Sequence, residues 1–160
     1  MERVKQFLKA SGDLKHRVAE TLSGEILEAA QTIRGRLASG GKLLLMGNGG
    51  SAADSQHIAA ELIGRFKKER GAIPAIALTV DSSSLTALGN DYGFETIFSR
   101  QIEALATAKD AVIGISTSGN SQNVIRALNL ARNMGAATIG LAGHGGGNMK
   151  DCVDICIVVP

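Results

Sequence analysis

The sequence predicts an α/β fold, a doubly wound five-stranded parallel sheet preceded by a pair of helices. Three observations support this fold class. Short apolar runs alternate with longer stretches whose apolar residues recur at helical spacing. The runs are apolar throughout, as strands covered on both faces are, and glycine and serine gather where the runs end. With 160 residues, of which 44% are hydrophobic, the chain suits one domain spanning residues 1–160.

The elements follow in order along the chain. Residues 1–39 carry apolar side chains at helical spacing and predict two helices, with a break near Ser23 and Gly24 and an end at the following glycines. Residues 42–160 form the α/β core, with strands expected at 42–46, 75–78, 110–115, 137–141 and 155–158. The opening helices have more apolar positions than a small sheet can cover, so we expect them to build an oligomer.

A run of hydroxyl side chains follows the third expected strand. It consists of Ser116, Thr117, Ser118 and Ser121. The helical pattern that begins at residue 122 places these hydroxyls at a helix N-terminus, where free backbone N–H groups and the helix dipole favour an anion. One of the serines, or Asn120, could simply cap the helix. Four hydroxyls exceed what one cap needs, so the run predicts a phosphate cradle.

A second turn rich in glycine and serine follows the first expected strand and precedes a helical pattern over residues 52–66. It consists of Gly47, Asn48, Gly49, Gly50 and Ser51. Ligands of an open parallel sheet bind beyond the carboxyl ends of its strands, so two such turns predict one cleft. The turn has neither the Gly-Lys-Ser/Thr of a Walker loop nor the three spaced glycines of a dinucleotide-binding loop, so nucleotide binding is not expected.

Two titratable side chains on the expected 52–66 helix are candidates for proton transfer. His57 and Glu61 are four residues apart and project from the same face. Glu61 stands among apolar residues, where partial burial would suit its carboxylate to proton abstraction. The pair also has the spacing for joint ligation of zinc, although two ligands do not make a site. The alternative is a surface glutamate with a neighbouring histidine and no part in chemistry.

Polar residues in a further loop are candidates for contacts with a sugar. Asn90 and Asp91 are expected on a polar loop after the second strand. Their side chains could bind sugar hydroxyls, or they could serve only the turn, in which such residues are common.

The composition limits the partners of the chain. With 17 basic and 15 acidic residues the net charge is +2, which predicts no strong attraction to nucleic acid. Aromatic residues make up 3% of the chain, so an aromatic platform for base stacking is not expected. No apolar run approaches membrane-spanning length, and residues 1–15 are charged throughout. We expect a cytoplasmic protein without a nucleic-acid or membrane partner.

Taken together, these motifs resemble the sugar isomerase (SIS) domain family, and within it the isomerases of heptose phosphates. The resemblance runs from the opening helices to the final strand and is carried by segments 47–51, 57–65, 74–78, 89–94, 98–100 and 114–121. It implies that a sugar phosphate is bound by Asn48, Gly49, Gly50, Ser51, Glu61, Asn90, Asp91, Ser116, Thr117, Ser118 and Ser121.

The resemblance also implies a reaction and an assembly. The reaction interconverts sedoheptulose 7-phosphate and D-glycero-D-manno-heptose 7-phosphate through an enediol, as in the synthesis of bacterial lipopolysaccharide, and it needs no redox cofactor. Glu61 would be the catalytic base, and His57 and Glu61 would be zinc ligands. The implied assembly is a homotetramer.

The sequence departs from the family pattern at its C-terminal end. The resemblance implies a further helix after the last strand that supplies a glutamine and a histidine, whereas the sequence stops at Pro160 and no residue is assigned to those roles. We therefore expect the 160-residue chain to bind sugar phosphate but to isomerise it poorly and to hold zinc weakly. Two alternatives are a non-catalytic SIS protein, either an adaptor of the bacterial replication initiator or a sugar-phosphate sensor, and an amino-sugar isomerase domain of a larger synthase.

Overall fold

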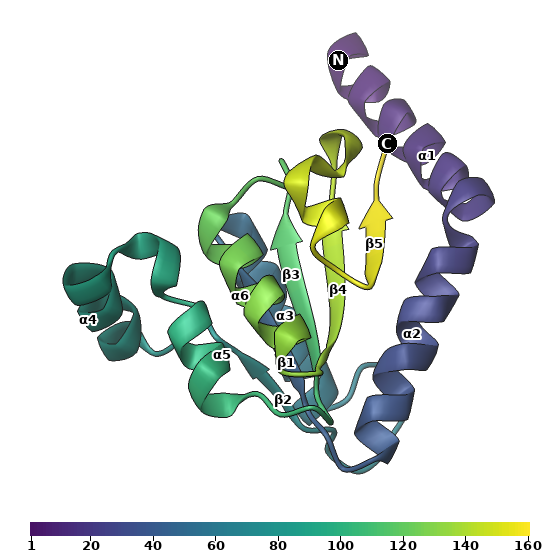
Figure 1. Ribbon diagram of the computed structural model, residues 1–160. Coiled ribbons are helices and arrows are strands. Elements are labelled where there is room, and N and C mark those ends of the chain that lie inside the picture. The colour runs from purple at the N-terminus through teal and green to yellow at the C-terminus, as the bar shows by residue number, and fades with distance from the viewer.

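A five-stranded parallel sheet lies between two layers of helices in the computed structural model, which describes residues 1–160 (Figure 1). The strands are β1 (Leu43–Gly47), β2 (Ala75–Ala77), β3 (Ala111–Ser116), β4 (Ala137–Ala142) and β5 (Ile155–Val158). Their order across the sheet is β2-β1-β3-β4-β5. The predicted sheet is confirmed, and the strand ends lie within one residue of their expected positions.

Helices cover both faces of the sheet. They are α1 (Glu2–Thr21), α2 (Ser23–Ala38), α3 (Gly50–Ile63), α4 (Ser82–Tyr92), α5 (Ser99–Leu105) and α6 (Gln122–Asn133), with the 3₁₀ turns η1 (Phe94–Thr96) and η2 (His144–Asp151). In Figure 1, α2 and α3 lie on one face of the sheet, and α5, α6 and η2 lie on the other. This is the doubly wound arrangement. None of the helices has both the length and the apolar character that a membrane span requires.

The core consists of two apolar layers, one on each face of the sheet. Leu44 and Met46 belong to the layer beneath α5 and α6, whereas Leu43 and Leu45 belong to the layer beneath α2 and α3. Successive side chains of a strand point to opposite faces, so a strand covered on both faces has to be apolar at every position. Burial of one leucine side chain contributes about 1.5–3 kcal/mol.

The two opening helices form as predicted, with the break at Leu22, one residue before its expected position. α2 packs on the sheet, whereas α1 projects away from it and packs mainly against α2 (Figure 1). No residue of α1 is buried. Val4, Phe7 and Leu8 are exposed to 61%, 65% and 69%, which leaves one apolar side of the helix without a cover.

Candidate functional site

The turns that follow β1 and β3 lie side by side at the carboxyl edge of the sheet. The two strands are parallel neighbours, with Gly47 opposite Ile115. The glycine turn (residues 47–51) and the serine loop (residues 116–121) therefore leave the sheet in the same direction, and they lead into α3 and α6. α3 begins two residues earlier than expected, at Gly50, and ends at Ile63. The two turns meet at the edge where the sequence predicts a ligand.

The serine loop brings its hydroxyl groups to the N-terminus of α6. Ser116 is buried, and its Oγ lies 2.9 Å from Oγ of Ser121. Ser121 is the N-cap residue of α6, yet its side chain makes no capping hydrogen bond. Thr117 and Ser118 are exposed, and Ser118 Oγ accepts a hydrogen bond from Asn120 N at 3.2 Å. The hydroxyls are not occupied in capping the helix, which favours the anion cradle over a simple cap.

A glycine-rich segment after β4 packs against the serine loop. Gly143 N donates to Thr117 O at 3.0 Å, and Met149 N donates to Gly119 O at 2.9 Å. Gly119 has a φ of 67°, and a Cβ at this position would collide with the carbonyl group of Gly146. Glycine alone satisfies both the backbone conformation and the close approach. The segment after β4 therefore fixes the path of the serine loop.

Asn48 of the glycine turn is bonded to Asn123 in the first turn of α6. Asn48 Nδ2 donates to Asn123 Oδ1 at 3.0 Å, and Asn123 Nδ2 donates to Asn48 Oδ1 at 2.8 Å. The motifs of the sequence did not single out Asn123. Its signal is a polar residue at a position of α6 whose helical neighbours, Ala127 and Ala131, face the core. Such a residue needs a buried partner.

His57 and Glu61 lie on α3 and form the expected pair, with 3.7 Å between Nε2 and Oε1. The His57 side chain is 74% exposed and that of Glu61 is 31% exposed. Glu61 is eleven residues along α3 from Gly50, roughly 16 Å at the rise of an α-helix. Its end of the helix lies at the amino edge of the sheet, because Ile73 N, just before β2, donates to Leu62 O at 3.0 Å. Within one chain, Glu61 is thus remote from the serine loop.

One chain brings together too few ligands for the expected zinc site. No group of three or more His, Cys, Asp or Glu side chains is close enough to hold a metal ion. A zinc site takes three or four protein ligands, and the pair on α3 provides two. The residues that one chain brings together do not fit a zinc site by themselves.

Asn90 and Asp91 lie in the last turn of α4, not on a loop as the sequence predicts. Both are exposed, and Asn90 Nδ2 donates to Asp91 Oδ1 at 2.8 Å. Figure 1 shows α4 projecting from the body of the domain beyond α5, on the side away from β4 and β5. One chain does not bring this pair to the serine loop.

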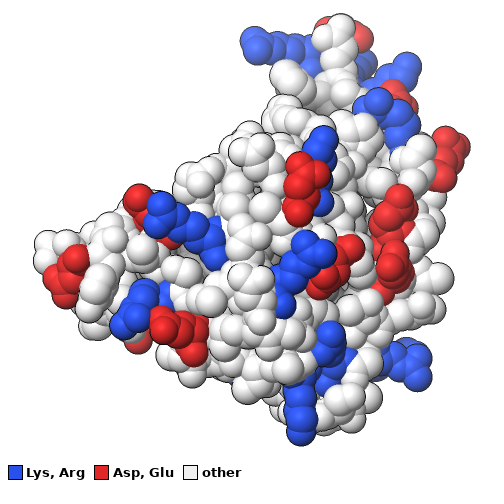
Figure 2. Space-filling view, viewed as in Figure 1, with Lys and Arg blue, Asp and Glu red and all other residues white.

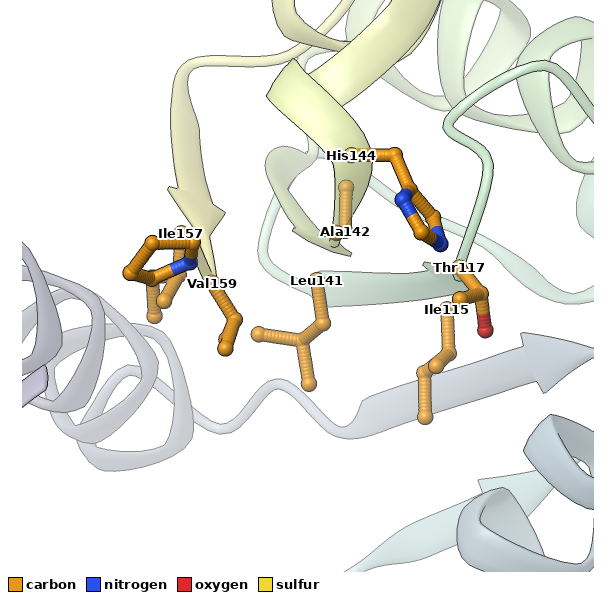
Figure 3. Close-up of a pocket in the computed structure, with 9 residues that line it drawn as sticks. Ile115, Thr117, Leu141, Ala142, His144, Ile157 and Val159 are labelled. Carbon is orange, nitrogen blue, oxygen red and sulfur yellow. The ribbon is translucent and has the colours of Figure 1, made fainter. Parts of the chain in front are cut away.

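A pocket of about 460 Å³ opens beside the serine loop, at the carboxyl ends of β3, β4 and β5 (Figure 3). Its walls are mostly apolar, with Ile115, Leu141, Ala142, Ile157 and Val159, and its polar side chains are those of Thr117 and His144. In Figure 3 the His144 ring lies above Thr117. An apolar pocket of this kind suits an apolar group better than the hydroxyls of a sugar.

Charged side chains of both signs share the surface shown in Figure 2. Several are paired, among them Arg132 with Asp154 at 3.1 Å and Arg126 with Glu95 at 3.6 Å. Nucleic-acid binding rests on basic side chains that neutralise phosphates, and the face in Figure 2 has no extended basic area.

Comparisons with known proteins identify the family to which the chain belongs. A family model described as the SIS domain matches residues 6–143. A phosphoheptose isomerase from Aquifex aeolicus is 54% identical over 160 residues, which are 100% of this chain and 84% of the relative. The structure of phosphoheptose isomerase from Neisseria gonorrhoeae matches with a TM-score of 0.93 at 42% identity, over 99% of this chain and 85% of that chain.

A second solved structure agrees with these matches. A phosphoheptose isomerase from Francisella tularensis has a TM-score of 0.95 at 36% identity and covers 99% of this chain and 85% of that chain. The named relatives are isomerases, so they support the isomerase and not the adaptor or sensor. The chain belongs to the SIS domain family and, within it, to the phosphoheptose isomerases.

Proposed function

We propose that the chain isomerises sedoheptulose 7-phosphate to D-glycero-D-manno-heptose 7-phosphate. One observation carries the proposal: the hydroxyls of the serine loop gather at the N-terminus of α6 beside the glycine turn, in a chain that belongs to the phosphoheptose isomerases. Backbone N–H groups and the helix dipole favour the phosphate there. The name of the relatives, phosphoheptose isomerase, indicates that the sugar has seven carbons.

The reaction moves one hydrogen between neighbouring carbons. A base removes a proton from C1 of the ketose, and the electron pair of that bond forms the C1–C2 double bond of an enediol while O2 takes up a proton. O1 then gives up its proton, C2 receives one, and the aldose results. We assign the base to Glu61, because a half-buried carboxylate suits proton abstraction.

The remaining polar residues of the cleft are assigned to binding. Ser116, Thr117, Ser118 and Ser121 would hold the phosphate, and Asn48, Gly49, Gly50 and Ser51 would line the sugar next to it. Asn90 and Asp91 would bind sugar hydroxyls. A carboxamide and a carboxylate side by side offer both donors and acceptors to a polyol.

We also propose a homotetramer that uses the opening helices. Glu61 and the serine loop of one chain lie at opposite edges of the sheet, and Glu61 lies about 16 Å along α3 from Gly50 of the glycine turn, so residues of different chains would complete one site. Two features support association. α1 leaves Val4, Phe7 and Leu8 exposed, and an apolar groove between α2 and α3 is lined by Ile33, Leu37, Ile58, Leu62 and Ile73.

Zinc is a separate proposal. His57 and Glu61 have the ligand types and the spacing for two bonds to zinc, and the further ligands would have to come from outside the set that one chain brings together. When bound, zinc would polarise the carbonyl oxygen of the sugar. Metal analysis after dialysis of the wild type and His57→Ala tests it, since we expect the variant to retain less zinc.

Two further proposals concern the cellular setting. We place the protein in the cytoplasm, where free sugar phosphates are made, and we assign its product to a heptose-containing glycan such as lipopolysaccharide. The support for both is the substrate class that the relatives' name implies.

A coupled assay with sedoheptulose 7-phosphate tests the proposed reaction. It is run on the 160 residues and on a polypeptide that continues beyond Pro160, in heavy water as well as in ordinary water. In the longer polypeptide we expect aldose formation together with incorporation of one deuterium at the carbon that receives the proton. An assembled protein that neither forms aldose nor exchanges the carbon-bound hydrogen would overturn the proposal.

A further inference from the structure

The amide pair of Asn48 and Asn123 is the direct link between the side chains of the glycine turn and those of α6. The two residues are 75 positions apart in the sequence, and their reciprocal hydrogen bonds are 3.0 Å and 2.8 Å long. They belong to segments that follow two adjacent strands, β1 and β3. The pair therefore joins the glycine turn to α6 beside the proposed sugar-phosphate site.

The backbone sets the orientation of the Asn123 amide. Its Oδ1 accepts a second hydrogen bond, from Val124 N at 3.0 Å, an N–H that is shared with Ser121 O at 3.1 Å. A flipped amide would turn Nδ2 toward that N–H, donor against donor. With Oδ1 of Asn123 fixed in this way, Asn48 has to present its Nδ2 to that oxygen, and its own Oδ1 to Nδ2 of Asn123. The backbone of α6 thus orients the Asn48 amide through Asn123.

The two members of the pair differ in their access to a ligand. Asn123 is 3% exposed, whereas Asn48 is partly exposed. An amide nitrogen carries two hydrogens, and Asn48 uses one of them in its bond to Asn123. The second has no acceptor within the chain. Asn48 can therefore donate to a ligand, and Asn123 is covered by the protein.

We propose that Asn123 is a positioning residue of the sugar-phosphate site and acts through Asn48. It fixes the direction of the Asn48 amide and the distance between the glycine turn and α6. The proposal rests on the proposed function, in which Asn48 contacts the sugar. Without Asn123, the Asn48 amide is free to rotate, and a ligand has to order it on binding. A side chain ordered in advance binds more tightly because that ordering does not oppose binding.

A double-mutant cycle tests whether Asn123 acts through Asn48. The dissociation constant of sedoheptulose 7-phosphate is measured by calorimetry for the wild type, Asn48→Ala, Asn123→Ala and the double variant. We expect Asn48→Ala to weaken binding about three- to thirtyfold, the range for one lost hydrogen bond. Asn123→Ala weakens it by no more than this, and it adds nothing in the Asn48→Ala background. Factors that multiply in the double variant would overturn the proposal.

A spectroscopic measurement separates positioning from a general structural role. The side-chain amide hydrogens of Asn48, followed by NMR without ligand, should exchange slowly in the wild type and fast in Asn123→Ala. Asn123→Asp keeps the acceptor but loses the donor, so its rate should lie between the two. Asn133→Ala is the control, because Asn133 is exposed at the last position of the same helix and should leave the rates unchanged.

The two measurements fail in different ways. A wild-type protein that binds no sugar phosphate would overturn the proposed function, and the Asn48 exchange rates would still report whether Asn123 orients its amide. Wild-type exchange rates for Asn48 in the folded Asn123→Ala protein would overturn the positioning role, even in an active isomerase. Unfolding midpoints of all variants identify those that are folded.

Discussion

The carboxylate of Asp110 and the ammonium group of Lys42 form an ion pair of 2.8 Å at the amino edge of the sheet, where the Asp110 side chain is 1% exposed. Asp110 Oδ1 also accepts from Lys42 N at 2.8 Å, and Oδ2 accepts from Thr107 N at 2.7 Å. Burial alone would raise the pKa of the Asp110 carboxyl group. The hydrogen bonds from Lys42 and Thr107 outweigh burial, and the pKa lies below its ordinary value.

This ion pair predicts a loss of stability in acid. Because the folded-state pKa of Asp110 is lowered, its stabilisation is complete above the ordinary aspartate pKa of about 3.9. It is lost as the pH falls from there through the folded-state pKa. Asp110→Asn should lower the free energy of unfolding by roughly 3 kcal/mol at pH 7, and the deficit should shrink toward pH 3. Urea unfolding at several pH values measures it, and a deficit independent of pH would contradict the role of the charge.

Replacement of both Ser116 and Ser118 by alanine should weaken sugar-phosphate binding while the chain stays folded. Each hydroxyl bonded to an ionised phosphate contributes about 1.5–3 kcal/mol. Calorimetric titration measures the change, and Ser82→Ala on the surface of α4 is the control. An unchanged dissociation constant in the double variant would refute the cradle.

Glu61→Gln in the assembled enzyme should lower turnover by about two to four powers of ten, the range for a general base, with a smaller effect on binding. The amide keeps the shape of the side chain but does not accept the proton. Glu69→Gln, at an exposed position, should be neutral. Exchange of the carbon-bound hydrogen of the substrate at the wild-type rate in Glu61→Gln would remove Glu61 from the role of base.

Gly119→Ala and Gly145→Ala form a matched pair. Both glycines have a positive φ, 67° and 79°. A Cβ at 145 meets open space, whereas a Cβ at 119 collides with the Gly146 carbonyl group. We expect Gly145→Ala to cost about 1 kcal/mol of stability from backbone strain. Gly119→Ala should cost more and should also weaken phosphate binding, because it moves the serine loop. Equal losses of stability would show that the contact with Gly146 is unimportant.

Substitution of Phe7 and Leu8 by aspartate should break the proposed tetramer into smaller species, because it places charge on the apolar side of α1 that we expect to lie between chains. Lys9→Asp, which introduces the same residue on the polar side of α1, should leave assembly intact. Light scattering gives the masses. A sharp monomer mass for the unmodified chain would exclude the tetramer.

The sequence predicts the sheet well because local and global signals agree. Residues such as Leu43 to Met46 are apolar on both faces and are followed by glycine, which leaves few alternatives to a buried parallel strand. The prediction that Asn90 and Asp91 lie on a loop is wrong, because they lie in α4. The glycine and polar residues around them are typical of a turn, but Asp81, which accepts from Ser84 N at 3.0 Å, caps a helix that runs through them.

Which residues the fold brings together at the site is harder to predict from the sequence than the motifs themselves. The spacing of His57 and Glu61 places them on one face of a helix, which the structure confirms. The spacing alone does not show that this part of α3 lies at the opposite edge of the sheet from the serine loop. The contact between Asn48 and Asn123 joins elements 75 residues apart, and it depends on β1 and β3 being neighbours in the sheet, which no local pattern specifies.

The exposure of α1 makes this helix a reporter of assembly. Most of the stability of a helix in a protein comes from packing of its apolar face, and no residue of α1 is buried. In a separated chain its amide hydrogens should exchange with solvent nearly as fast as those of an unfolded peptide, while the strands stay protected. In an assembly that covers Val4, Phe7 and Leu8, exchange in α1 should slow by orders of magnitude. The exchange rate of one helix, followed against protein concentration, would then give the association constant without any substrate.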